Sequence, residues 1–328
     1  MEDFRNIIEQ LEEAKLFIKR GSVSTCRIAL ILTDNTVELI LHSVSEHKLS
    51  MYEVNKRLNA QMQEIERKAK VKGKLSSLPE LSASEVRSIR RSFPEKVKFL
   101  AREKFLDSTI SDCLVELHET RNAAFHRGET NSTTMYILAM IYFRVACTVF
   151  KSHSPDFFHS EEAKMEFFYQ RYGVEKYWDR DPKRSERIAD SLLGDMHLFA
   201  NQVATTFERS IKDYLKRIEQ SLKFLTTNSR MTERVEHYRL ATYVANEDSY
   251  PVDPNDRLST IELRISDEIV ADWLAKTESW KGLGSIEKIY LQYSKVERSA
   301  VPLVEAVERI ESDLEQAIQI EIDIAKGK

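Results

Sequence analysis

Apolar residues recur every three or four positions along most of the chain, which is the spacing of one face of an α-helix. The first such run consists of Phe4, Ile7, Ile8, Leu11, Ala14 and Phe17. It predicts a helix over residues 3–19 that Gly21 ends. The same reasoning in the first half of the chain predicts helices over 23–48, 52–70, 94 to about 128, and 134–150, with a loop at 71–84.

The pattern changes after about residue 155, where the chain becomes more charged. We therefore expect a helical bundle in residues 1–155 and a second, mostly helical domain in residues 156–328, with a role in sensing, inhibition or assembly. Residues 178–187 have the composition of an irregular connection, and 246–257 that of a loop. The predicted helices here are 185–225, 230–245 and a final one. Residues 258–265 fit either a short strand or the start of a helix.

The last predicted helix carries apolar residues in 4-3-4-3 spacing. They are Leu303, Val307, Ile310, Leu314 and Ala317. The repeat is short, so internal packing is favoured over an extended coiled coil. The whole chain of 328 residues holds only 8 Gly and 7 Pro, which indicates few turns and an all-α fold.

Several features predict a cytoplasmic protein. The N-terminal segment is acidic and amphipathic, unlike a signal peptide. The most apolar run, residues 135–150, contains Arg144 and is short for a membrane span, so we expect a buried helix and no membrane contact. Cys26, Cys113 and Cys147 lie far apart and show neither zinc nor disulfide spacing.

Charge is distributed unevenly along the sequence. Residues 56–104 contain fourteen Lys or Arg and six Asp or Glu, a net charge of +8, whereas the whole chain carries −4. A basic window in an otherwise acidic chain attracts phosphates. It also fits an ordinary solvated helix face with a lysine-rich loop, and the charge alone favours that second interpretation.

The segment ELHETRNAAFHRGE, Glu116–Glu129, places Arg121, Asn122 and His126 near the end of an apolar helix that Gly128 terminates. Arginine and histidine at this spacing also occur by chance, and Arg230 with His237 is such a background match. The context of the first pair is more specific. Asn122 follows the arginine directly, and an earlier apolar helix contains Asp34 and Glu38, which are candidates to hydrogen-bond Arg121.

The segment LHETRNAAFHRG resembles the Arg-Asn-x-x-x-His signature of the HEPN superfamily, the higher-eukaryote and prokaryote nucleotide-binding domains. ALILTDNTVELILHS is similar to the first core helix of many bacterial members. The resemblance covers about residues 1–155. It implies a small all-α bundle, often dimeric, and a metal-independent endoribonuclease of a toxin–antitoxin or anti-phage system. Arg121, Asn122 and His126 take the motif positions. Gly128 replaces the tyrosine that a partner enzyme modifies in some members.

The residue types suit this chemistry. Cleavage of RNA by its own 2′-OH needs a base, an acid and positive charge on the phosphorane-like transition state. Histidine transfers protons near neutral pH, and arginine presents a charged fork to phosphate oxygens. Arg127 is a candidate for additional phosphate affinity. We therefore expect RNA as substrate, no metal and no cofactor, and an antitoxin or sensor protein as a further partner.

Helix geometry adds a condition, because five residues separate Arg121 from His126. On a regular helix their side chains point about 140° apart. A homodimer, or a higher homo-oligomer, that brings two Arg/His sets into one cleft satisfies this condition. A helix C-terminus favours protonated histidine, yet the sequence leaves the acid or base role of His126 open.

Three other interpretations remain. The chain fits a catalytically silent helical module that binds nucleotides or a partner protein. Arg121, Asn122 and His126 also fit a buried ion-pair and capping cluster. Asp34, Glu38 and His42 share one helix face at metal-ligand spacing, although ligands four residues apart are common by chance. His118 and its neighbours Glu116 and Glu119 are expected at the surface.

Overall fold

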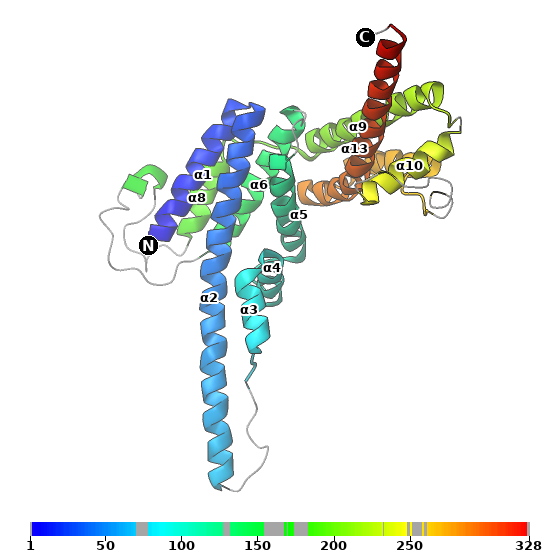
Figure 1. Ribbon diagram of the computed structural model, residues 1–328. Helices are drawn as coiled ribbons and strands as arrows, with labels where there is room; N and C mark the ends of the chain where they lie inside the picture. The colour runs from blue at the N-terminus through cyan, green and yellow to red at the C-terminus, as the bar shows by residue number, and fades with distance from the viewer. Residues whose placement is uncertain are drawn as a thin grey trace. The chain divides into compact units, whose positions relative to one another are not determined.

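The computed structural model describes residues 2–69, 78–126, 132–153, 167–168, 170–173, 183–231, 233–247, 250, 258 and 261–326. Every regular element in these residues is a helix, which confirms the all-α class (Figure 1). The chain forms two compact units, Met1–Leu198 and Phe199–Lys328. The sequence placed the boundary near residue 155, but helix α8 (Arg184–Leu193) packs on the helices of the first unit and belongs to it.

The first unit is organised around α6 (Ser132–Ser152), two thirds of whose residues are buried. Helices α1 (Glu2–Arg20) and α2 (Val23–Ala69) pack on each other and on α6. Helix α5 (Ser108–His126) contacts α2 and α6. This packing follows from the sequence, because α6 is apolar over most of its surface and buries that surface against neighbouring helices.

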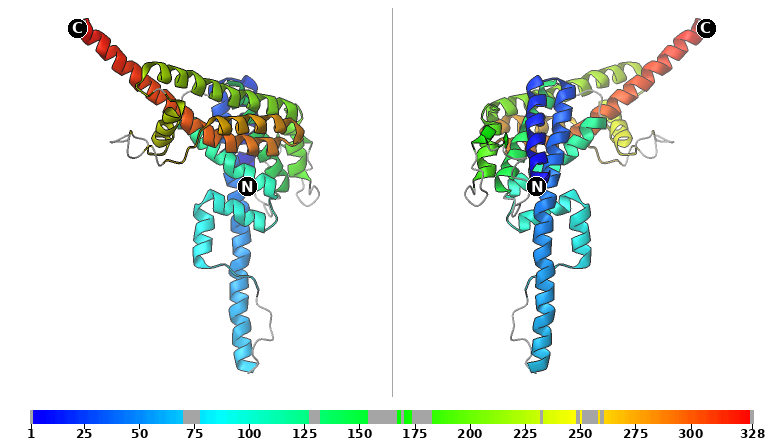
Figure 2. Two further views of the ribbon diagram at one scale, coloured as in Figure 1. Left: turned by 90° about the vertical axis from the view of Figure 1, so that its right-hand side faces the viewer. Right: turned by 90° about the vertical axis from the view of Figure 1, so that its left-hand side faces the viewer.

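Helix α2 is continuous from Val23 to Ala69, so the predicted break between residues 48 and 52 is wrong. Ser50 donates to the backbone carbonyl of His47 within the helix, and no glycine or proline interrupts it. The C-terminal half of α2 lies beside α3 (Ala83–Arg91), as Figures 1 and 2 show. The Asn59 side chain of α2 binds the backbone of Leu78, which precedes α3. It donates to the Leu78 carbonyl (2.8 Å) and accepts from the Leu78 N–H (2.9 Å).

The single helix predicted from residue 94 to about 128 is divided in the structure. Helix α4 (Phe93–Arg102) ends before α5 begins, and Lys104 between them has a left-handed φ of 59°. The N–H of Lys104 bonds to the Ala101 carbonyl, and that of Phe105 to the Leu100 carbonyl. These two bonds form a Schellman motif, which normally has glycine at the left-handed position. The absence of glycine is why the sequence did not predict this helix end.

The second unit contains α9 (Ala200–Asn228), α10 (Arg234–Glu247), α12 (Asp267–Ser279) and α13 (Ile286–Ala325), with a 3₁₀ turn at Trp280–Gly282. The predicted helix 185–225 is two helices, because the chain is irregular between Gly194 and Phe199. Residues 261–266 form neither strand nor helix. The α9–α13 pair is the main contact of this unit.

An aromatic cluster lies at the centre of the second unit. Phe207 stacks on Tyr293 with ring centroids 3.9 Å apart, and Trp280 meets the same ring edge-on. All three side chains are fully buried. Along α13, Leu303, Val307 and Ile310 are buried as the seam predicted, whereas Leu314 is half-buried and Ala317 is exposed. The seam therefore serves internal packing over its first half.

Two of the described helices, α2 and α6, have the length and apolarity of a membrane-crossing helix. The apolar window of α6 is 78% buried inside the protein, which is also what the core helix of a soluble protein shows. A membrane protein is therefore not indicated. The three cysteines are free and buried, in agreement with the absence of a disulfide framework in the sequence.

Candidate functional site

Asp34 is the centre of a polar cluster in the first unit. It lies on the core-facing side of α2, and its side chain has 0% of its surface exposed. Its Oδ1 accepts from the hydroxyl of Tyr142 on α6 and lies 2.9 Å from Nδ1 of His118 on α5. Three helices therefore contribute polar groups to one buried carboxylate, and its burial cost is offset by these hydrogen bonds.

Arg121 is held by the second oxygen of the same carboxylate. Its Nε donates to Asp34 Oδ2 at 2.8 Å, and its Nη2 donates to the same atom. Its Nη1 donates to Oδ1 of the neighbouring Asn122 at 2.8 Å. The Arg121 side chain keeps 26% of its surface exposed, and Asn122 is exposed. The guanidinium is thus held by Asp34 and Asn122, and the side chain remains partly exposed.

His118 belongs to this cluster and is not a simple surface residue. Its ring stacks on Phe93 of α4, with centroids 4.2 Å apart and planes 12° from parallel. Its side chain is 19% exposed, and Glu38 Oε1 lies 3.6 Å from its Nδ1. Glu38 is more exposed, at 42%, and lies 3.9 Å from Arg121 Nη2. Phe93 and Asp34 together hold the imidazole in one orientation.

The charges around Asp34 determine its protonation state. Burial is the largest influence and opposes ionisation. The hydrogen bonds from His118 and Tyr142, with the charges of His118 and Arg121, outweigh it and lower the pKa of Asp34 below its ordinary value. Burial and the nearby carboxylate raise the pKa of the Tyr142 hydroxyl well above its ordinary value, so it stays a donor. Asp34 is therefore an ionised acceptor at neutral pH.

The sequence-predicted residues are brought together in part. Asp34, Glu38, Arg121 and Asn122 form one cluster, and α5 extends as far as His126. The side chain of His126 and the whole of Arg127 lie outside the described residues. His42, the third member of the predicted polar stripe on α2, is exposed.

The geometry also places ligand atoms of Asp34, Glu38 and His118 within 4.8 Å of one another. The contacts argue against a cation there. Oδ1 of Asp34 already accepts from Tyr142 and faces Nδ1 of His118, and Oδ2 accepts two N–H groups of Arg121. A carboxylate offers about four lone-pair sites, so these four contacts fill them. The Arg121 guanidinium supplies the positive charge that a metal ion would bring.

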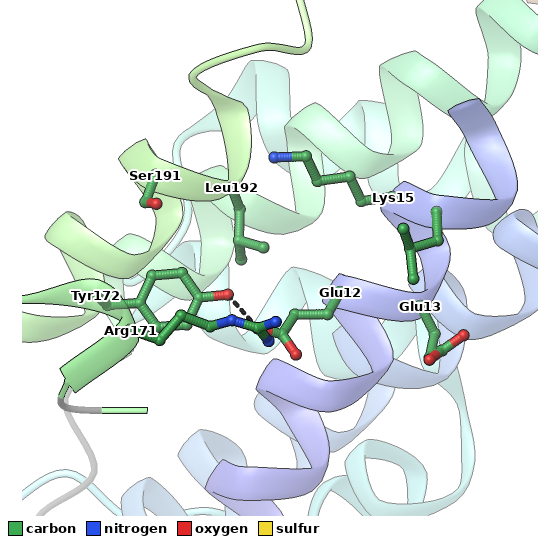
Figure 3. A pocket seen from close by; sticks show the side chains of 8 residues that line it. Glu12, Glu13, Lys15, Arg171, Tyr172, Ser191 and Leu192 are labelled. Atoms are coloured by element: carbon green, nitrogen blue, oxygen red, sulfur yellow. Dashed lines mark hydrogen bonds and ion pairs between the residues drawn. The ribbon is translucent and has the colours of Figure 1, made fainter. Parts of the chain in front are cut away.

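A second polar cluster lines a pocket of about 360 Å³ beside α1 and α8 (Figure 3). Glu12 accepts from Arg171 Nη1 at 2.6 Å and from the Tyr172 hydroxyl at 2.5 Å. On the same helix, Lys15 pairs with Asp195 at 2.5 Å. The charges of Glu12, Lys15 and Arg171 are thus each paired within the protein, so this cluster fastens residues 171–172 and 195 to α1.

Comparisons with protein-family models, with curated proteins and with solved structures gave no match. The fold and the cluster therefore define an all-helical protein with a partly exposed arginine anchored on a buried carboxylate. The HEPN resemblance stays a prediction that depends on the residues of the motif.

His118 and Tyr142 are the members of the cluster that the sequence did not single out. A signal for His118 was present, because it precedes Arg121 by three residues and therefore lies about 60° from it on the same helix face. Tyr142 lies in a continuous apolar run, and nothing in the one-dimensional pattern separates it from ordinary core residues.

Proposed function

We propose that the protein is a metal-independent endoribonuclease of a bacterial toxin–antitoxin or anti-phage system. In this proposal Arg121 stabilises the charge that develops on the scissile phosphate, Asn122 positions it, and His126 transfers a proton. The observation that carries the proposal is the anchoring of Arg121 by Asp34, which holds a partly exposed guanidinium in a fixed position.

A fixed cation is what electrostatic catalysis of phosphoryl transfer needs, because no free energy is then spent on reorienting it in the transition state. Asp34 and Arg121 neutralise each other in part, but the outward N–H groups still point away from the carboxylate. The exposed basic residues Lys56, Arg57, Arg87 and Arg91 of α2 and α3 offer a phosphate-binding surface in the same unit.

The proposal includes a homodimer, because five residues separate Arg121 from His126 and two such positions on a regular helix point about 140° apart. A surface for the second copy is the groove of about 360 Å³ between α1 and α2, which Phe17, Ile28 and Leu32 line with their apolar side chains.

The decisive experiment incubates the full chain with RNA in the presence of a chelator and analyses the new ends. We expect cleavage without divalent metal and products with 2′,3′-cyclic phosphates. Arg121→Lys keeps the positive charge but removes the planar guanidinium that can donate two parallel hydrogen bonds to a phosphate. It should therefore lower kcat/KM by about 10²-fold or more. Arg217→Lys is the matched control, since Arg217 forms a similar fork with Glu308 (2.6 Å to each oxygen) in the second unit.

His126→Ala should abolish cleavage and leave the circular dichroism spectrum unchanged. For the dimer, Ile28→Glu should shift sedimentation toward the monomer and reduce cleavage, whereas Met51→Glu, an exposed apolar position farther along α2, should change neither. A chain that binds RNA or a nucleotide without cleaving it would contradict the enzyme proposal and identify the silent binding module.

A further inference from the structure

The proposed nuclease needs a general base, and the Asp34 cluster contains a group with that geometry. His118 lies on α5 one turn before Arg121, on the same face of the helix, and its Nδ1 is 2.9 Å from Asp34 Oδ1. The ring is 19% exposed and is held against Phe93. In contrast to His126, this histidine points within about 60° of Arg121 on a regular helix.

The contact with Asp34 fixes the tautomer of the ring. An ionised carboxylate only accepts hydrogen bonds, so Nδ1 of His118 carries the hydrogen in this contact. In the neutral ring the lone pair is then on Nε2, at the opposite side. Among the described residues, all the polar contacts of His118 are made through Nδ1, which leaves Nε2 for a ligand.

We propose that His118 is the general base of this site, with Asp34 as the residue that orients it. This inference rests on the proposed ribonuclease function and adds a catalytic residue to it. Nε2 of His118 takes the proton of the RNA 2′-OH, the 2′-oxygen forms a bond to phosphorus, and the bond between phosphorus and the 5′-oxygen breaks. His126 gives a proton to that leaving oxygen, so the protons balance without a further reactant.

The charged groups that face His118 favour this role. Asp34 and Glu38 approach its ring from α2, and Arg121 lies beside it on α5. Phe93 of α4 adds no charge, and the Tyr142 hydroxyl of α6 bonds to Asp34. The imidazolium formed by proton transfer therefore lies beside two carboxylates, while Arg121 is directed toward the phosphate. A buried Asp that orients a His base is the arrangement of the hydrolase triads.

The test is the pH dependence of RNA cleavage by His118→Asn. The asparagine amide can replace Nδ1–H as the donor to Asp34 but has no titrating nitrogen. We expect kcat/KM to fall by about 10²- to 10⁴-fold, with loss of the acid-side limb of the pH–rate profile. RNA affinity should stay within about threefold, as a proton-transfer role predicts. His42→Asn, an exposed histidine on α2, is the matched control and should retain the wild-type profile.

The outcomes separate this inference from the proposed function. If His118→Asn cleaves RNA within threefold of the wild type and keeps the acid-side limb, while Arg121→Lys and His126→Ala lose cleavage, the ribonuclease stands and the base is not His118. If the wild type cleaves no RNA, both proposals fall. Thermal unfolding of His118→Asn close to that of the wild type shows that any loss of activity arises in the reaction and not in folding.

Discussion

Arg121 on α5 donates two hydrogen bonds to one oxygen of Asp34, a residue 87 positions earlier that has no exposed surface. This ion pair connects α2 to α5 and holds the partly exposed guanidinium in a fixed position. A salt bridge of this kind is weak evidence for net stability, because both charges lose water. Its value lies in orientation, and removal of one partner leaves the other uncompensated.

Asp34→Asn should therefore destabilise the first unit strongly. The substitution leaves Arg121 without its anion and places an amide donor among other donors, at a cost of about 3–5 kcal/mol in the free energy of unfolding. Urea unfolding measures this cost. Glu38→Gln is the matched control, because Glu38 is partly exposed and its loss should cost less than about 1 kcal/mol. Equal effects of the two substitutions would refute the central role of Asp34.

The lowered pKa of Asp34 predicts a pH dependence of stability. The unfolded state binds the proton more tightly than the folded state, so the stabilisation by Asp34 is complete above the ordinary aspartate pKa of about 3.9 and is lost as the pH falls through the lower folded pKa. The measurement is the difference in unfolding free energy between wild type and Asp34→Asn. It should be constant near neutral pH and shrink below about pH 4. A difference that stays constant in acid would contradict the prediction.

Tyr142→Phe should cost about 1–3 kcal/mol, since it removes a buried donor to Asp34 and leaves that oxygen short of one hydrogen bond. It should also raise the pKa of Asp34 toward its ordinary value. Thermal unfolding and carboxyl titration by NMR measure the two effects. Tyr136→Phe, on the same helix and half-buried, is the control and should change stability by less than about 0.5 kcal/mol.

Lys104→Gly should stabilise the protein. Lys104 has a φ of 59°, in the left-handed region that side chains with a Cβ atom disfavour. Glycine at this Schellman position should raise the free energy of unfolding by about 1 kcal/mol. Lys104→Ala keeps the Cβ atom and removes the charge, so it should have little effect. Loss of stability in the glycine variant would show that the lysine side chain makes a larger contribution than its backbone strain.

Phe207→Ala should destabilise the second unit by about 3–5 kcal/mol, because it empties the position stacked on Tyr293 in a fully buried cluster. Guanidinium unfolding followed by tryptophan fluorescence measures the loss, since Trp280 lies against the same tyrosine. Phe199→Ala removes a phenylalanine with 67% of its surface exposed and should cost less than about 0.5 kcal/mol. Similar costs at both positions would contradict the proposed core.

The sequence predicted the helical class and most helix positions, because the spacing of apolar residues depends only on local geometry. It located helix ends less well. The end of α4 at Lys104 lacks the glycine that normally signals such a turn, and the continuation of α2 through residues 48–52 depends on α4 and the chain at residue 78 packing against it. The first case is local, because the N–H groups of Lys104 and Phe105 bond to the carbonyls of Ala101 and Leu100, whereas the second involves residues distant in the sequence.

For the candidate site, the sequence by itself determined the chemical groups. It placed a guanidinium, an amide and an imidazole within six residues of one helix, and two carboxylates on an earlier helix. Only the tertiary structure decided that Asp34 holds Arg121, and that His118 and Tyr142 share the same carboxylate. The physical reason is that an ion pair between helices depends on the rotation of each helix about its axis. That rotation is set by the packing of the whole core against α6.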